Sequence, residues 1–137
     1  MAKEKLYDVA GLHFASVFHP GAAAATGTLK TAIWKAPCAC KVESVFLHGD
    51  VAVVGDDTNS FSLATTNGGA AGAGTAAVGA ATFAAAGGTI AALAKVDLSP
   101  AAGVAFAEGD IMLLTRTKIG TGLILGASSI QVQFRPT

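Results

Sequence analysis

Apolar and polar residues alternate along several short stretches of the chain, with the period of two that is expected of half-buried β-strands. The stretches end at turn-forming residues such as Pro20-Gly21, because proline and glycine interrupt strand pairing. The clearest strands are therefore predicted over residues 12–18, 28–34, 36–47, 111–118 and 130–135.

Residues 36–63 contain the strand with which the rest of the chain is expected to pair. Pro37 has a fixed φ angle and no backbone N–H, so this strand is predicted to begin just after it. Residues 41–43 alternate in polarity, and residues 45–47 are apolar on both faces. We therefore expect the strand to pass from a half-exposed edge into the core.

Residues 64–94 are the least regular part of the pattern. They are nearly all alanine, glycine and threonine, with larger apolar residues only at Val78, Phe83, Ile90 and Leu93. Alanine favours helix, whereas the repeated glycines and threonines favour strands and loops. Strands and loops are the favoured interpretation, and a short helix remains the alternative.

The whole pattern amounts to about eight or nine short strands separated by turn signals, which is typical of an antiparallel sandwich or barrel. No repeat of fixed period and no alternation of strands with helices is evident. The 137 residues are predicted to form one all-β domain, 1–137, in which residues 1–10 are a mobile arm.

Composition narrows the class of protein further. Hydrophobic residues make up 52% of the chain but aromatic residues only 7%, so the core is expected to depend on a few large side chains. These are Phe14, Phe18, Trp34, Phe46, Phe61, Phe83, Phe106 and Phe134. The formal net charge is zero and no basic stripe is present, which argues against a nucleic-acid partner. No signal peptide or membrane span is expected, because no long apolar run follows the charged N-terminus.

Candidate metal ligands lack the spacing that metal sites use. Cys38 and Cys40 could bind zinc together with His13, His19 and His48, but paired Cys-x₂-Cys or His-x₃-His spacing is missing. If the segment is extended, the two cysteines lie about 6.5–7 Å apart, at the outer limit for a disulfide. Buried thiols and surface histidines are therefore the favoured interpretation.

Three further patterns are interpreted as turns. Asp50, Asp56, Asp57 and Asn59 lack the spacing and the closing glutamate of a calcium loop. The glycines of residues 72–74 and 120–122 lack the Gly-Lys-Ser/Thr ending of a phosphate loop. Glu108 and Asp110 flank a turn glycine and have no visible partner for acid–base chemistry. No catalytic residue, metal site or cofactor is predicted, and the chain is not expected to be an enzyme.

Three motifs resemble a group of small tailed-phage virion proteins, the head decoration (cement) proteins and related virion-surface β domains. They are Ala36-Pro37-Cys38-x-Cys40-x-Val42-x-Ser44-Val45, then Asn59-x-Phe61-x-Leu63-x-x-x-Asn67-Gly68-Gly69-x-x-Gly72-x-Gly74-Thr75, then Gly109-Asp110-x-Met112-x-Leu114-x-x-x-Lys118-x-Gly120-x-Gly122-Leu123. The likeness runs over roughly residues 34–135 and is least for residues 1–27. It implies a jelly-roll-like sandwich located on the virion, at the capsid surface, after synthesis in the host cytoplasm.

The resemblance also implies partners: the major capsid protein and further copies of the chain, as a homotrimer formed before or upon docking. Residues 1–27 and 64–94 are the expected contact segments. Two alternatives stay open. The chain could be a head-fibre, neck or tail-surface protein of the same fold, or a carbohydrate-binding sandwich with Trp34 and Tyr7 as its stacking platform.

Overall fold

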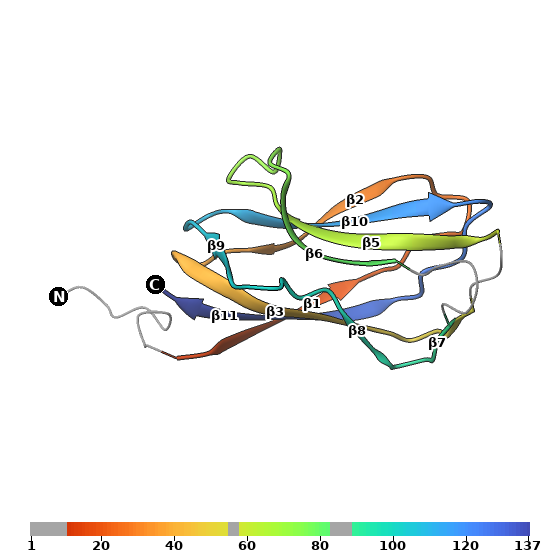
Figure 1. Ribbon diagram of the computed structural model, residues 1–137, viewed down its shortest axis with the longest axis horizontal. Coiled ribbons are helices and arrows are strands. Elements are labelled where there is room, and N and C mark those ends of the chain that lie inside the picture. Colours follow the sequence, from red (N-terminus) through yellow and green to blue (C-terminus); the bar gives the residue numbers. More distant parts are fainter. Residues whose placement is uncertain (1–10, 55–57, 83–88) are drawn as a thin grey trace.

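The computed structural model describes residues 11–54, 58–82 and 89–137 of the chain. Every regular element in these residues is a β-strand, and the strands form two antiparallel sheets that face each other (Figure 1). No helix in the described residues is long and apolar enough to cross a membrane. The predicted all-β antiparallel sandwich is confirmed.

Five strands form the first sheet, four form the second, and two form a small ribbon. The first sheet contains β1 (His13–His19), β11 (Ser128–Pro136), β3 (Cys40–Gly49), β8 (Lys95–Asp97) and β9 (Val104–Phe106). The second contains β2 (Leu29–Lys35), β10 (Ile111–Ile119), β5 (Ser60–Asn67) and β6 (Ala76–Thr82). The ribbon pairs β4 (Val53–Val54) with β7 (Thr89–Ile90).

The strand order is that of a jelly roll. The first sheet runs β1-β11-β3-β8, with β9 also paired to β3, and the second runs β2-β10-β5-β6. When the ribbon is set aside and β8 and β9 are taken as one interrupted strand, the chain has eight strand positions. If these positions are numbered 1 to 8 along the chain, their order is 1-8-3-6 in one sheet and 2-7-4-5 in the other. This order is the double Greek key of a jelly roll.

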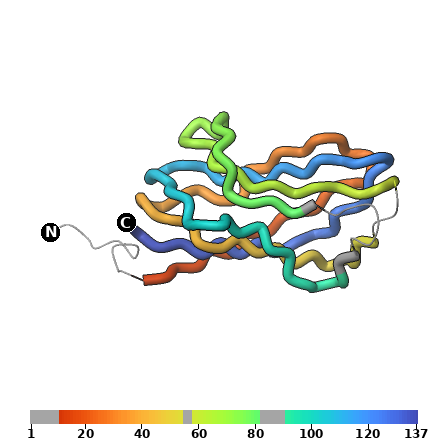
Figure 2. The backbone as a smooth tube through the Cα atoms, viewed as in Figure 1, coloured from red at the N-terminus to blue at the C-terminus, as the bar shows by residue number. Residues whose placement is uncertain are grey.

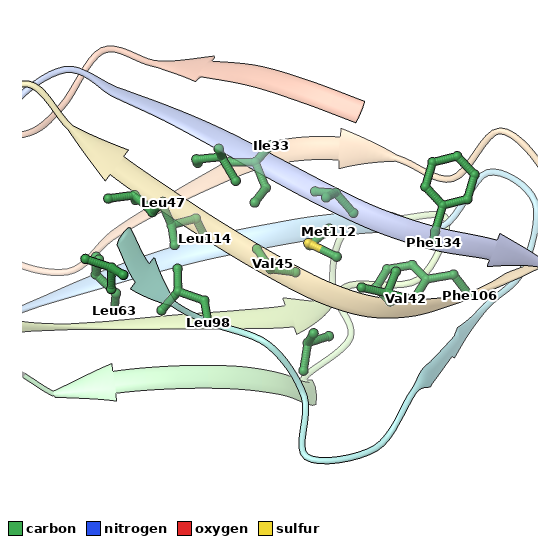
Figure 3. Packing of buried hydrophobic residues seen from close by; sticks show 14 of the residues in the cluster. Ile33, Val42, Val45, Leu47, Leu63, Leu98, Phe106, Met112, Leu114 and Phe134 are labelled. Carbon is green, nitrogen blue, oxygen red and sulfur yellow. The ribbon is translucent and has the colours of Figure 1, made fainter. Parts of the chain in front are cut away.

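The core fills the space between the two sheets (Figure 3). Strand β3 contributes Val42, Val45 and Leu47, and β10 contributes Met112 and Leu114, all nearly or fully buried. Val42 and Val45 are three residues apart, so strict alternation would place them on opposite faces. A register shift opposite Gln133 and Phe134 adds one residue to β3 there, and this bulge turns both valines inward.

The strand predicted just after Pro37 begins later than expected. Residues 37–39 form a bend, and β3 starts at Cys40, where it pairs with Pro136 on one side and Phe106 on the other. The start is set by these partners rather than by the proline. For the same reason β3 is not an edge strand at its beginning, because it is paired on both sides.

Strand β1 lies where the sequence predicted a strand, within one residue, but the face that was expected to be buried is the exposed one. The alternation of residues 12–18 was expected to supply core phenylalanines, but Phe14 and Phe18 are 58% and 72% exposed. The inward face of β1 instead carries the smaller residues Ala15 and Val17, which pack against the core. Phe83 lies outside the described residues, so its predicted place in the core remains a prediction.

Residues 64–94 form strands and loops in their described part, as favoured from the sequence. Strand β6 closes one side of the sandwich against the segment that follows β8. A side-chain Cβ at Gly79 would lie 2.0 Å from the carbonyl oxygen of Leu98, so only glycine permits this approach. The Thr65 hydroxyl accepts from the Gly79 N–H at 3.1 Å and lies 3.1 and 3.2 Å from the carbonyl oxygens of Gly79 and Leu98. We call this contact the seam.

The two ends of the sandwich differ in what they present. The described chain begins, in red, at the same end as the C-terminus, and the ribbon that contains β7 lies at the other end (Figures 1 and 2). Residues 1–10, the predicted arm, lie outside the described residues. The end that carries the ribbon is therefore separated from both ends of the described chain by about one strand length.

Candidate contact surfaces

The two cysteines do not form a disulfide, and their environments differ. Cys40 is buried at the start of β3, and Cys38 is partly exposed in the bend before it. Burial is the main cause that raises the pKa of the Cys40 thiol to about 12, with smaller contributions from Cys38 and Asp110. Cys40 is therefore a protonated, unreactive thiol near neutral pH. In the residues that the structure describes, no three metal-ligating side chains come together.

The three histidines lie apart and have separate structural surroundings. His13 stacks on Phe134 with ring centroids 5.6 Å apart, and His48 Nδ1 lies 3.3 Å from the carbonyl oxygen of Leu93. His19 was expected at the surface but is 2% exposed, and burial lowers its pKa. Its Nδ1 accepts a hydrogen bond from the Gly21 N–H at 3.0 Å, so the neutral ring is the form that fits.

Two of the acidic and amide residues that were interpreted as turn residues, Asp110 and Asn59, accept hydrogen bonds, one of them local and two of them from residues far away in the sequence. The Asp110 carboxylate accepts from the Ala107 N–H at 2.9 Å and from the Asn67 amide at 3.0 Å. The Asn59 side-chain oxygen accepts from the Thr121 N–H at 2.8 Å. Asp56 and Asp57 lie outside the described residues.

Trp34 is placed as a core residue rather than as a stacking platform. Its indole is partly buried and lies 5.7 Å from the Phe106 ring and 5.1 Å from the Phe134 ring. Tyr7, the second member of the proposed platform, lies outside the described residues. The position of Trp34 therefore gives the carbohydrate-binding alternative no support.

Arg116 is a buried cation that the sequence analysis missed. It lies on β10, is 1% exposed, and donates to the carbonyl oxygens of Thr26 and Leu123, the latter at 2.6 Å. A third contact reaches the Ala24 carbonyl at 3.4 Å, and the guanidinium carbon lies 5.3 Å from the centre of the Phe61 ring. Burial lowers its pKa. The alternation of β10 was the available signal, because it places position 116 on the same inward face as 112 and 114.

The contacts of Arg116 hold two loops in place at the ribbon end of the sandwich. Its acceptors belong to the segment 20–28, between β1 and β2, and to the segment 120–127, between β10 and β11. The same two segments are joined by a bridge between Ala22 and Leu125, with hydrogen bonds of 2.8 and 2.9 Å. The loop surface at this end is therefore fixed by buried backbone bonding.

The surface around the β4–β7 ribbon, next to these loops, is apolar. Val51, Val54, Leu93 and Ile124 are 50%, 63%, 71% and 60% exposed, and we call these four residues the apolar end. Val51, Val54 and Ile124 line an open groove of about 440 Å³. Leu93 and Phe18 line a second groove of about 310 Å³ beside it. Exposed aliphatic residues that gather in this way are typical of a contact surface.

The outer faces of the two sheets differ in character. The outer face of the β2-β10-β5-β6 sheet carries mostly alanine, serine and threonine, together with apolar residues of β10 such as Ile119 and the charges of Lys30 and Lys35 on β2. The outer face of the other sheet carries aromatic and charged side chains, including Phe14, Phe18 and Phe46, whose ring lies 4.4 Å from the Lys95 ammonium. Of the segment 64–94, the outward residues of β5 and of the described part of β6 belong to the outer face of the β2-β10-β5-β6 sheet, and Leu93 belongs to the apolar end.

Comparison with known proteins gives a likeness in structure only. No protein-family model and no curated protein sequence matches the chain. A solved structure with a similar fold is a chain described as part of the Cyanophage Pam1 capsid asymmetric unit. The two share 14% sequence identity with a TM-score of 0.60, and the match covers 100% of this chain and 93% of that chain. At this identity, the likeness shows that the two chains share a fold over the whole of this chain and 93% of the other.

Proposed function

We propose that this chain is a structural virion protein of a tailed phage: a decoration protein that binds the outer surface of the major capsid protein lattice and stabilises the head. The observation that carries the proposal is the full-length likeness to a chain of a cyanophage capsid. The resemblance of the motifs at 36–45, 59–75 and 109–123 to head decoration proteins points to the same role. The role needs binding surfaces and no catalytic chemistry.

We assign the contact with the shell to the apolar end. Of its four exposed aliphatic side chains, Ile124 lies on one of the two loops that Arg116 and the Ala22–Leu125 bridge hold in place. Val54 lies in the paired β4–β7 ribbon, and the Leu93 N–H donates to the Gly49 carbonyl at 2.7 Å. A surface that is ordered before binding loses little conformational entropy on docking, which favours affinity. The absence of net charge also means that approach to a shell of either sign is not opposed by long-range repulsion.

Stabilisation of the head then follows from mass action. A protein that binds the expanded shell and not its unexpanded or disrupted forms stabilises the expanded shell by about 2.7 kcal/mol per site at a free concentration of 100 Kd. Assembly as a homotrimer at three-fold positions increases the effect, because the second and third contacts form at a high effective concentration. Weak contacts between each single copy and the shell are therefore sufficient to stabilise the expanded head.

The test is sedimentation of the purified protein with empty heads of the phage that encodes it. We expect it to pellet with expanded heads and to stay in solution with unexpanded ones. Val54→Asp and Ile124→Asp each place a carboxylate in the apolar end and should weaken binding about tenfold or more. Thr117→Asp is the matched control, because Thr117 is exposed on the outer face of the β2-β10-β5-β6 sheet, and this variant should bind normally. Equal binding by all variants would remove the apolar end from the proposal.

Copy number separates the decoration role from the alternatives. A particle map should show the protein distributed over the whole shell, in threes, if it is a decoration protein. Density confined to a fibre, the neck or the tail would instead favour a virion-surface protein of the same fold at that location. Deletion of residues 1–10 tests the proposed arm, because unchanged occupancy of the head by the truncated protein would exclude a role for it.

A further inference from the structure

Sheet edges expose unpaired backbone groups that can pair with another chain, and proteins normally protect them with charges, bulges, covering segments or short strands. Three of the four edges of this sandwich are protected. Strand β2 carries Lys30 and Lys35 and contains a bulge at the register shift opposite Met112 and Leu113. Strand β6 contains a bulge of its own, opposite Thr65 and Thr66, and is covered at the seam. Strands β8 and β9 are three residues each.

The fourth edge, β1, has none of these protections from the residues that the structure describes. In the described part of the chain it pairs only with β11, and its seven residues follow β11 without a register shift. It contains no lysine, arginine, carboxylate or proline. Its outward face instead exposes Phe14 and Phe18, at 58% and 72%. An uncharged, regular edge strand with exposed aromatic residues is the arrangement that favours pairing with another strand.

The sequence of β1 indicates what that other strand is. It reads His13-Phe14-Ala15-Ser16-Val17-Phe18-His19, which is the same in both directions except for the exchange of alanine and valine. Two antiparallel strands related by a two-fold axis at Ser16 place each residue opposite the one at the mirrored position. A palindromic strand therefore meets chemically matching residues when its partner is a second copy of itself.

We propose that two copies of this chain associate through β1, which pairs antiparallel with β1 of the second copy about a two-fold axis at Ser16. Phe14 lies opposite Phe18 of the second copy, and Phe18 lies opposite Phe14 of the second copy. Both pairs are on the outward face, on which Ser16 also lies between them, because alternate residues share a face. The result is one continuous sheet through both copies, with two symmetric aromatic pairs that stabilise the register.

This contact is a property of the free chain and does not depend on binding to a shell. It uses neither the apolar end nor the outer face of the β2-β10-β5-β6 sheet. A homotrimer can therefore still form elsewhere on the molecule, and β1 would then join two trimers across a two-fold axis. The contact doubles the mass of a free monomer, and it at least doubles the mass of a trimer, which carries three copies of β1.

The test uses the fact that position 16 pairs with itself. Ser16 is exposed, so Ser16→Lys and Ser16→Glu do not disturb the core. Each should abolish the doubling, because two like charges then lie directly opposite each other at the axis. An equimolar mixture of the two variants should restore it as a mixed pair, since lysine then faces glutamate. Thr117→Lys adds the same charge at an exposed position of the other sheet and should behave like the wild type.

The measurement is the molecular mass in solution, by sedimentation equilibrium, as the protein concentration is raised. The proposal expects the wild type and Thr117→Lys to reach at least twice the mass of Ser16→Lys, and the mixture to regain that mass. It is overturned if Ser16→Lys has the mass of the wild type at all concentrations, or if the mixture stays at the lower mass. Head binding by Ser16→Lys is measured separately and bears only on the decoration role.

Discussion

The seam between β6 and the segment after β8 gives a prediction whose size can be worked from the coordinates. Gly79→Ala adds a Cβ that would lie 2.0 Å from the carbonyl oxygen of Leu98, and also 2.6 Å from its carbonyl carbon and 2.7 Å from the Ser99 oxygen. Ordinary contact at such a Cβ begins at 3.4 Å. The difference between 3.4 and 2.0 Å means that the two backbones must separate by about 1.4 Å. Both sides of the contact are backbone, so no side-chain rotation can relieve it.

That separation has two energetic consequences. Overpacking of a close contact destabilises a protein by about 1–3 kcal/mol. A shift of this size also takes the Thr65 hydroxyl out of reach of Leu98, from 3.2 Å, and leaves partly buried polar groups without partners at about 1–3 kcal/mol. We expect Gly79→Ala to lower the free energy of unfolding by about 2–6 kcal/mol in total.

Gly49→Ala is the matched control, because it makes the same change at another strand glycine. A Cβ at Gly49 would meet its nearest neighbour, the Ser128 hydroxyl, at 3.6 Å, which is an ordinary contact. Alanine there restricts the unfolded chain more than the folded one, so Gly49→Ala should raise stability by about 0.4–1 kcal/mol. The two substitutions should therefore have opposite signs.

Urea unfolding at one fixed protein concentration measures both changes. A third variant, Thr65→Val, removes the hydroxyl that bridges Gly79 and Leu98, and its effect should not add to that of Gly79→Ala, because both break the same contact. A loss below about 0.5 kcal/mol for Gly79→Ala, or an equal loss for Gly49→Ala, would refute the reasoning, since surface substitutions without a specific mechanism fall in that range.

Three further outcomes are expected. Burial lowers the pKa of His19 below the unfolded value of 6.5, so below that pH the unfolded state binds more protons than the folded state. The contribution of His19 to the free energy of unfolding is therefore full above pH 6.5 and falls as the pH drops below it. Thermal unfolding between about pH 8 and pH 5 should show this loss, and His19→Asn, which keeps an acceptor for the Gly21 N–H, should reduce it. Arg116→Met should destabilise the protein by about 2 kcal/mol, because loop carbonyls lose their hydrogen-bond donors. It should also speed the hydrogen exchange of the Ala22 amide. Unchanged exchange would show that the loops do not depend on the guanidinium. Iodoacetamide should label Cys38 faster than Cys40 in the folded protein, because Cys40 is buried with a pKa of about 12; equal rates by mass spectrometry would contradict this placement.

Much of the strand pattern follows from residues that are close together in the sequence. Strands β10 and β11 lie where apolar and polar residues alternate, because alternation is a property of the strand itself. The turn before β10 was likewise evident, since Gly109 has a φ of 88°, which glycine adopts readily. Elements and turns of this kind depend on local chemistry, and local chemistry is present in the sequence.

Which face of a strand is buried depends instead on what packs against it. In β1 the larger residues, Phe14 and Phe18, face outward, although size alone favoured them for the core. In β3 a bulge reverses the alternation between Val42 and Val45, and its position depends on pairing with β11, more than eighty residues away. A period of two defines two faces, but only the opposing sheet decides which of them is the inside.

The features of the candidate surfaces likewise fall into those that follow from the sequence and those that depend on tertiary packing. The sequence by itself determined that the chain is a neutral β protein without a recognisable catalytic or metal-binding motif, and it contains the near-palindrome of β1. Only the tertiary structure decided that β1 is an edge strand paired on one side among the described residues, that Arg116 is buried beneath two loops, and that four aliphatic residues from three separate segments gather at one end. These features arise from contacts between residues far apart along the chain, and such contacts exist only once the sheets have paired and packed.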